Sequence, residues 1–163
     1  MTLKRSRFLN PALLALTAFL LLAPPAWADK QIILEASAAH TANGQSGSYD
    51  AAGFTIAYIN VNVTAGSGTV NPFKVSLEGS NDGDVTFFGI PCSLIAKDVA
   101  GPGGTVTMTA APGHTLIVNE VAVVSSATQY LALCTIGAPR VRAHWVIAGT
   151  TPSETFSVSV NLK

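Results

Sequence analysis

Clusters of basic residues are missing from most of this sequence. Beyond residue 28 the six Lys and Arg residues are dispersed, and only Arg140 and Arg142 lie close together. Proteins that bind nucleic acid need a basic patch to neutralise phosphates, so nucleic acid is excluded as an expected partner. The apolar run from Pro11 to Leu22 is shorter than the roughly 20 residues that span a bilayer. We therefore expect no membrane insertion once the N-terminal segment is removed.

The motifs of familiar enzyme sites are missing too. No serine lies in a GxSxG turn, no histidines have the HExxH spacing of a zinc protease, and the two cysteines are not in a CxxC motif. The three histidines, His40, His114 and His144, are scattered along the chain, and we interpret them as incidental. The sequence predicts a protein that is not an enzyme and that holds neither a cofactor nor a metal.

An export signal is present at the N-terminus. Lys4, Arg5 and Arg7 precede the apolar run, and Ala26-Trp27-Ala28 places small residues at the two positions that a signal peptidase reads. We predict that residues 1–28 are a cleaved signal peptide. The mature chain, 29–163, has the length of one domain. Its net charge is −3, because the leader removes three of the nine Lys and Arg and none of the nine Asp and Glu.

The mature chain keeps two cysteines, Cys92 and Cys134. Disulfides persist in the compartments that exported proteins reach, so we expect these two residues to be paired. The alternative is two separate buried thiols. Either way the role is structural, since no neighbouring base suggests redox chemistry.

Short runs of Val, Ile, Thr and Phe, separated by Gly, Pro, Asn and Ser, indicate an all-β fold. Apolar and polar residues alternate along Phe73–Glu78 and along Phe156–Leu162, as in strands with one solvated face. A change of apolar parity between Phe54 and Thr64 predicts a β-bulge near Tyr58. Six other strands are predicted at Gln31–Ala36, Val85–Phe88, Thr105–Thr109, Thr115–Val124, Gln129–Thr135 and Val141–Ala148. The fold expected is a single antiparallel β-sandwich, jelly-roll-like, with about eight or nine strands.

The region before Phe54 suggests a route to self-assembly. Residues 37–53 are rich in Ala, Ser, Gly and Asn, and we expect a flexible loop or linker there. The preceding apolar segment, Gln31-Ile32-Ile33-Leu34, is a candidate strand donor that could pair with the sheet edge of a neighbouring molecule. The alternative, which we favour, is that this segment is an ordinary first strand of its own domain.

One turn is a candidate binding loop. Asn81-Asp82-Gly83 joins two predicted strands, and Glu78, Asp82 and Asp84 could donate oxygen ligands to calcium there. However, the spacing departs from that of an EF-hand, and Asn-Asp-Gly is a common hairpin turn. We prefer the turn interpretation.

The residues Val75-Ser76-Leu77-Glu78-Gly79-Ser80-Asn81-Asp82-Gly83 resemble a strand-turn motif found in two groups of small β-sandwiches. One group is the discoidin-type domains, which bind carbohydrate or lipid. The other is a set of phage and prophage structural proteins that look like capsid-decoration modules. This chain follows the order of motifs in the second group, from Tyr58–Val63 through this motif to a late stretch of Arg142, Trp145, Gly149, Thr150, Pro152, Ser153, Thr155, Phe156 and Val158. The leader and the two cysteines depart from that group, so the resemblance implies the fold and not the virion role.

We expect an exported structural or interaction protein of the periplasm, the cell surface or the extracellular space. Its expected partners are other copies of itself, in an assembly, or a surface glycan. The alternative function is a secreted carbohydrate-binding module of discoidin-like type. Phe87, Phe88 and Tyr130 are then the candidate aromatic contacts.

Overall fold

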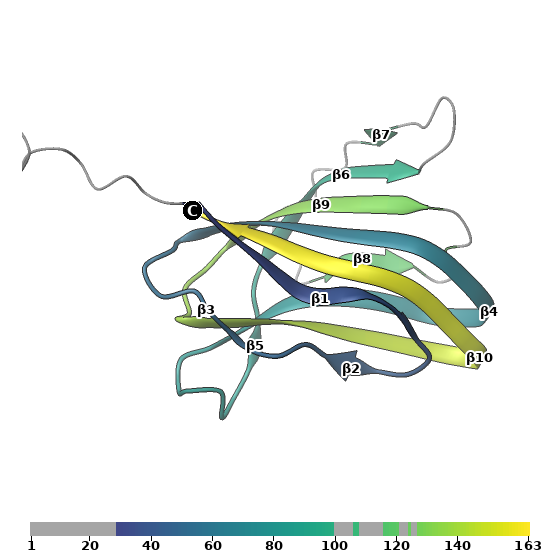
Figure 1. Ribbon diagram of the computed structural model, residues 1–163, viewed down its shortest axis with the longest axis horizontal. Coiled ribbons are helices and arrows are strands. Elements are labelled where there is room, and N and C mark those ends of the chain that lie inside the picture. The colour runs from purple at the N-terminus through teal and green to yellow at the C-terminus, as the bar shows by residue number, and fades with distance from the viewer. Residues whose placement is uncertain (1–28, 100–105, 108–115, 121–123, 125–126) are drawn as a thin grey trace, which may run out of the picture.

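The computed structural model describes residues 29–99, 106–107, 116–120, 124 and 127–163 (Figure 1). The described residues form strands and connecting turns without any helix, so no helix there could cross a membrane. All strand pairs are antiparallel, which confirms the predicted all-β antiparallel fold. The strands are β1 (Lys30–His40), β2 (Gly44–Gln45), β3 (Tyr49–Asp50), β4 (Ile56–Ser80), β5 (Phe88–Gly89), β6 (Cys92–Val99), β7 (Val106–Thr107), β8 (Leu116–Glu120), β9 (Thr128–Thr135) and β10 (Arg140–Leu162).

Two long strands, β4 and β10, organise the molecule. They pair with each other along nearly their whole length, from Leu162 opposite Ala57 to Arg140 opposite Ser80. Each contains two of the strands predicted from sequence, because the turn signals at Gly66-Ser67-Gly68 and Gly149–Pro152 are bends within a strand and not connections between strands. Figure 1 shows both strands turning back at the same end of the molecule.

Glycines make this bend possible. Gly68 and Gly149 have φ values of +79° and +138°, which L side chains rarely adopt. A Cβ atom on Gly68 would lie 2.1 Å from the carbonyl oxygen of Thr151, and one on Gly149 would lie 1.8 Å from that of Thr69. The two strands approach so closely at the bend that neither position has room for a side chain.

The bend divides one sheet into two layers. The front layer has the order β1, β10, β4, β9, β6 and β7, and uses the C-terminal half of β10 with the N-terminal half of β4. The back layer uses the other halves, flanked by β2 and β3 beside β10 and by β5 and β8 beside β4. The result is a sandwich whose two layers share their central strands.

Alternation along the long strands fills the space between the layers. Each half of β4 and β10 turns four apolar side chains inward, and all of these are buried: Ala57, Ile59, Val61 and Val63; Val70, Phe73, Val75 and Leu77; Val141, Ala143, Trp145 and Ile147; Phe156, Val158, Val160 and Leu162. Contacts cross between the layers, since the Phe156 ring lies 5.4 Å from that of Phe73 and 5.5 Å from that of Trp145. Each buried Val, Leu, Ile or Phe side chain of this set contributes about 1.5–3 kcal/mol on burial.

The predicted bulge near Tyr58 is wrong. β4 begins at Ile56, and its pairing with β9 and β10 has no register shift at Tyr58. Ile56 is 40% exposed and Tyr58 is half-buried on the outer side, so the strand has a single parity with Ala57 and Ile59 inward. Apolar residues on the outer face produced the apparent change of parity.

Two other strand predictions need correction. Val85–Phe88 is mostly a loop, and only Phe88 pairs, with Gly79. Strand β6 was not predicted, because a register shift between Leu94 and Ala96 interrupts the alternation that identifies a strand. The leader (1–28), His114 and the turn signals at 101–104 and 112–113 lie outside the described residues.

Residues 37–53, expected to form a flexible loop or linker, alternate short strands with loops along the sheet. β1 continues to His40, and β2 and β3 both pair with β10 in the back layer. The Asn43 side chain accepts a hydrogen bond from the Ile147 backbone N–H, and the Ser46 hydroxyl accepts one from that of Ala143. Hydrogen bonds to small polar side chains thus hold this segment against the sheet edge. Apolar residues are not needed for this attachment.

Cys92 and Cys134 form a disulfide, as predicted. They are directly opposite each other on β6 and β9, with their Cα atoms 4.1 Å apart, and both are buried. The bond crosslinks residues 42 apart in sequence and fastens β6 to the front layer.

The steric limit at the bend can be tested with Gly149→Ala. The added Cβ meets the Thr69 carbonyl, so we expect the free energy of unfolding to fall by roughly 3 kcal/mol or more. Gly53→Ala is the control, because Gly53 has φ +85° but open space around it and should cost only about 1–2 kcal/mol. Equal losses in urea unfolding would show that backbone strain alone, without the close approach, governs the bend.

Removing the disulfide with Cys92→Ala and Cys134→Ala together should lower the free energy of unfolding by roughly 2–4 kcal/mol, because the unfolded chain gains freedom. Urea unfolding with and without a thiol reductant measures the loss. The reductant should destabilise the wild type and leave the double variant unchanged. A double variant as stable as the oxidised wild type would contradict a stabilising role.

Candidate functional site

Polar residues occupy the outward positions in the middle of β4 and along the C-terminal half of β10. Along β4 the inward Ile59, Val61 and Val63 alternate with Asn60 and Asn62, and β10 has the same pattern. The register places Asn60 beside Ser159 of β10 on one side and beside Leu131 of β9 on the other. Side chains that are distant in sequence therefore form continuous rows across the outer face.

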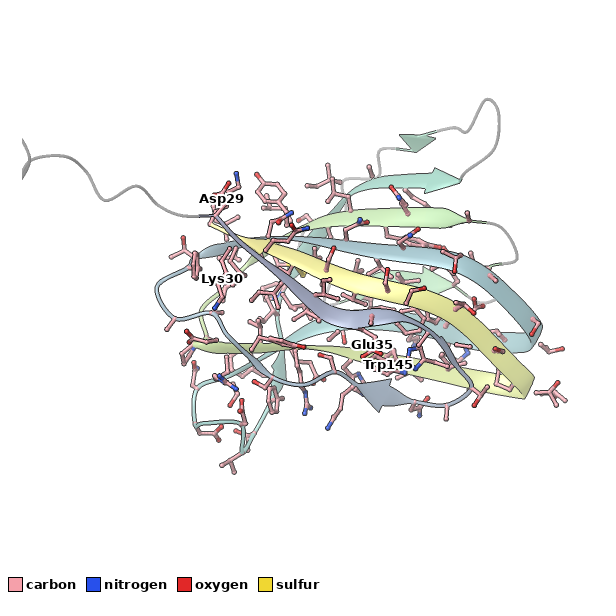
Figure 2. All side chains as sticks on the ribbon, in the orientation of Figure 1. Asp29, Lys30, Glu35 and Trp145 are labelled. Carbon is pink, nitrogen blue, oxygen red and sulfur yellow. A yellow bond between two sulfur atoms is a disulfide. The ribbon has the colours of Figure 1, made fainter. Side chains whose placement is uncertain are left out.

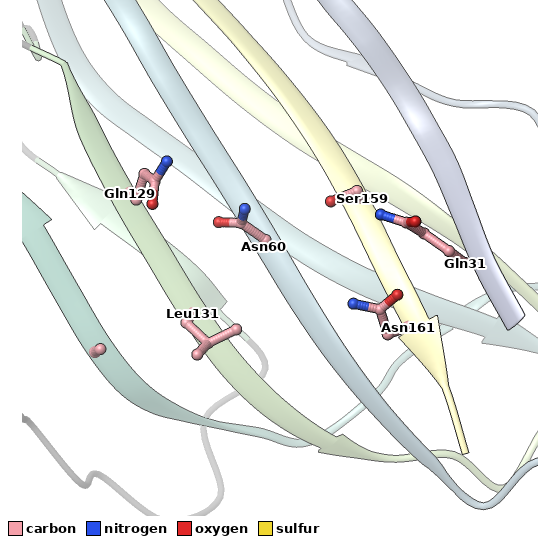
Figure 3. A pocket seen from close by; sticks show the side chains of 7 residues that line it. Gln31, Asn60, Gln129, Leu131, Ser159 and Asn161 are labelled. Carbon is pink, nitrogen blue, oxygen red and sulfur yellow. The ribbon is translucent and has the colours of Figure 1, made fainter. Parts of the chain in front are cut away.

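A groove of about 320 Å³ lies across these rows (Figure 3). Its described lining residues come from five adjacent strands of the front layer: Gln31, Asn60, Ala96, Gln129, Leu131, Ser159 and Asn161. Figure 3 shows Gln129, Asn60 and Ser159 following one another across β9, β4 and β10. Four of the seven residues are carboxamides, and none carries a charge.

The carboxamides of the groove have no side-chain partner within the described part of the protein. Within the described part of the chain, Gln31, Asn60, Gln129 and Asn161 make no side-chain hydrogen bond, and no salt bridge reaches them. Each amide offers two N–H donors and one carbonyl acceptor. Leu131, with 36% of its surface exposed, adds an apolar contact between them. The groove can therefore donate and accept hydrogen bonds over a partly apolar floor.

A second cavity, of about 410 Å³, adjoins the groove through Asn161. Its other described lining residues are Asp29, Tyr58 and Lys163. The Lys163 ammonium is 3.3 Å from the Asp29 carboxylate and 5.8 Å from the centre of the Tyr58 ring. Figure 2 shows Asp29 and Lys30 at the start of β1, at this end of the front layer.

The candidate binding loop, Asn81-Asp82-Gly83, is a turn whose polar groups bond to one another. The Ser80 hydroxyl donates to the Asp82 carboxylate at 2.7 Å, and the Thr86 backbone N–H donates to it at 2.9 Å. The Thr86 hydroxyl also bonds to Asp82 and is the largest influence that lowers the pKa of this carboxyl to about 2, followed by the Thr86 N–H and Ser80. These bonds serve the turn rather than a ligand.

The other carboxylates that suggested calcium are also engaged. Asp84 accepts hydrogen bonds from Arg140 at 3.0 and 3.2 Å and from the Ser48 hydroxyl at 2.6 Å, and the bond from Arg140 is the main influence that lowers its pKa. Glu78 pairs with Arg142 at 2.8 Å. The described residues contain no group of three potential metal ligands.

Charge gathers on the outer face of the back layer instead. Arg142 pairs with Glu78 and also lies 3.5 Å from the centre of the Phe87 ring. His144, half-buried, is 3.7 Å from the same carboxylate. The two outer faces of the sandwich thus differ in chemistry, with paired charges on the back and neutral side chains in the front groove.

The three aromatic candidates have different positions. Tyr130 is buried between the layers, so it cannot be a surface contact. Phe87 is covered by Arg142, whereas Phe88 is 45% exposed beside the loop that carries Val85. Sequence parity could not identify Tyr130 as inward, because its side chain combines a core-sized ring with a polar hydroxyl.

A polar cluster beside the buried Tyr130 was not predicted, and its Lys97 and Glu120 side chains are 32% and 27% exposed. The Tyr130 hydroxyl donates to Glu120 at 2.9 Å, and Lys97 pairs with the same carboxylate. Burial, and then the bond to Glu120, raise the pKa of Tyr130. Glu154 is fully buried, and its pKa is raised chiefly by that burial. In the sequence, Glu154 is in phase with the inward residues Phe156 and Val158, and this alternation could have indicated that it is buried.

His40 has a packing role that its sequence position did not reveal. Its ring contacts those of Trp145 and Phe156, with centroids 4.7 and 4.6 Å away, and its Nε2 atom is 3.5 Å from the Glu35 carboxylate. Glu35 and Trp145, both labelled in Figure 2, thus lie on the His40 side chain from different strands. His40 therefore has a role in packing, which the sequence interpretation did not consider.

The candidate strand donor Gln31–Leu34 is the first part of β1. It pairs with β10 of its own chain, Gln31 opposite Asn161 and Ile33 opposite Ser159. Ile32 and Leu34 are buried in the core, whereas Ile33 is 62% exposed on the outer face. The segment occupies the position of an ordinary first strand, which was the favoured alternative.

Comparisons with known proteins give one structural neighbour. No protein family matches the sequence, and no characterised protein matches it in sequence. The structure is similar to that of the SPBc2 prophage-derived protein YomS, with a TM-score of 0.43 and 8% identity, over 83% of this chain and 94% of the other. The neighbour is of prophage origin, and at this level of similarity no role is transferred from it.

The turn network predicts a pH-dependent stability. Because the pKa of Asp82 is lowered in the folded state, its contribution is fully present above about pH 4 and is lost as the pH falls through about 2. Asp82→Asn should therefore be less stable than the wild type at pH 7, and the difference should shrink as the pH falls through about 2 and vanish below it. Urea unfolding at a series of pH values measures this, with the exposed neighbour Asn81→Ala as control. A difference that does not shrink between pH 7 and pH 2 would contradict the mechanism.

Proposed function

We propose that this protein is an exported, non-enzymatic interaction module of the cell surface or extracellular space, and that the front groove is its contact site. The observation that carries the proposal is the groove itself, which crosses five strands and has carboxamides without internal partners. A rigid sheet holds these side chains in fixed rows, so a partner meets a preformed surface.

Export is supported by the leader and by the disulfide. The Cys92–Cys134 bond is compatible with an oxidising extracellular environment, where such bonds persist. It fastens β6, which contributes Ala96 to the groove, so an oxidising destination also preserves the contact site.

The chemistry of the groove supports binding rather than catalysis. Ser159 is its one hydroxyl nucleophile among the described lining residues, and no lining residue there is a general base. The titratable residues with raised pKa values, Tyr130 and Glu154, are inside the sandwich and turned away from this face.

Self-assembly by strand exchange, the other route to an interaction, has weaker support. β1 lies at an edge of the front layer, but its pairing with β10 has register shifts between Ile33 and Glu35 and between Glu35 and Ala38. Bulges of this kind twist an edge and hinder pairing with another chain. The groove therefore carries the proposal.

The test measures attachment of labelled mature protein, residues 29–163, to cell-envelope preparations of the organism that encodes it. We expect Asn60→Ala together with Gln129→Ala to weaken attachment at least tenfold, because both amides lie in the groove. Asn119→Ala, an exposed asparagine on β8 of the back layer, is the matched control and should attach like the wild type.

Light scattering on the same samples shows whether the attached species is a monomer, and circular dichroism shows that each variant is folded. The contact site is wrong if the double variant and the Asn119→Ala control attach equally well. Wild-type protein that does not attach to any envelope preparation would contradict the surface role.

A further inference from the structure

The described residues that line the groove include four carboxamides and a hydroxyl, and none of them is charged. From this combination we infer that its ligand is a neutral polysaccharide, which rests on the proposed function and specifies the partner. A sugar ring presents hydroxyls that both donate and accept, and a carboxamide matches adjacent hydroxyls with one donor and one acceptor. Gln31, Asn60, Gln129 and Asn161 supply four such groups on one face.

The absence of charge selects against other polar ligands. Phosphorylated or sulfated ligands need Lys or Arg partners, and cationic ligands need carboxylates. The described residues that line the groove include neither kind. On the back face, by contrast, Arg140 and Arg142 are present but already paired with Asp84 and Glu78. Once anionic and cationic ligands are excluded, a ligand with neutral hydroxyl groups is the best match for the groove.

The apolar contacts agree with a sugar. Leu131 is partly exposed between the amides, and Ala96 lies next to it on β6. Sugar rings have C–H faces between their hydroxyls, and these need small apolar surfaces rather than deep pockets. Tyr58, in the adjoining cavity, adds an aromatic ring beside Asn161.

The extent of the groove favours a chain over a single sugar. The lining residues run from Gln31 on β1 to Ala96 on β6, across five strands. At about 4.8 Å between strands this is roughly 19 Å, which is the length of several linked sugar rings. The second cavity adjoins the groove only at Asn161, and its Asp29 and Lys163 are paired with each other at 3.3 Å.

A peptide is less well suited to this surface. Extended peptides bind sheets by adding a strand to an edge, where backbone groups are free. Here β10, β4 and β9 are interior strands whose backbone groups are already paired. Side chains alone can contact the ligand, which suits a partner recognised through its hydroxyl groups.

The experiment is affinity electrophoresis of the mature protein in gels that contain dextran, laminarin, galactomannan or xylan. At least one of these neutral polysaccharides should retard the wild type. Asn60→Ala and Gln129→Ala should each weaken that retardation roughly two- to tenfold, the effect of one lost hydrogen bond. Asn60→Asp keeps the shape and replaces the donor by a charge, so it should weaken binding at least as much.

Three controls make the result specific. Asn119→Ala should be retarded like the wild type. The charged polysaccharide alginate and an extended polar peptide should not bind at the groove. Thermal unfolding of each variant shows that lost retardation is not lost folding. The inference is overturned if no neutral polysaccharide retards the protein, if groove variants bind unchanged, or if alginate or the peptide is bound in preference.

Failure of this inference is distinguishable from failure of the proposed function. If the groove variants lose attachment to envelopes while no neutral polysaccharide binds, the groove remains the contact site and only the ligand class is wrong. If the groove variants still attach to envelopes, the contact site itself is wrong.

Discussion

The antiparallel pairing of β4 with β10 is the constraint on which the rest of the structure depends. It supplies the central strands of both layers, and every other pairing except that of β6 with β7 and β9 is made against one of these two strands. Residues as far apart as Ala57 and Leu162 must meet for the front layer to form, and the back layer needs Ser80 to meet Arg140. Loop closure over such distances is costly, so we expect slow folding that is dominated by this one pairing. The bend at Gly68 and Gly149 then converts a single ladder into a sandwich.

Local pattern was enough to identify the class of fold and most strands, because alternation records which side of a strand meets the core. This alternation correctly located the strands at Phe73–Glu78 and Phe156–Leu162. It could not locate features that depend on residues distant in sequence. Gly66–Gly68 has the composition of a turn, and only its pairing with the β10 bend shows that the strand continues. In β6 the bulge at Ile95 removed the alternation itself.

The candidate site was less accessible from sequence than the fold. Asn60, Gln129 and Asn161 come from three strands, and nothing in the local sequence of any one of them indicates the other two. Carboxylates and aromatic residues attracted attention because their chemistry is distinctive, yet Asp82, Asp84 and Tyr130 all have partners within the protein. The disulfide could be predicted, since two cysteines have only one possible pairing with each other.

Alternation along the central strands has a consequence for how such a protein can diverge. Ile59 and Val61 determine stability, while Asn60 between them only faces outward. Substitutions at outward positions of a sheet usually change stability by no more than about 0.5 kcal/mol. The groove can thus acquire a new preference through successive exchanges on one face without any repacking of the core. The inward residues of each strand are constrained by core packing, whereas the outward residues can change during evolution.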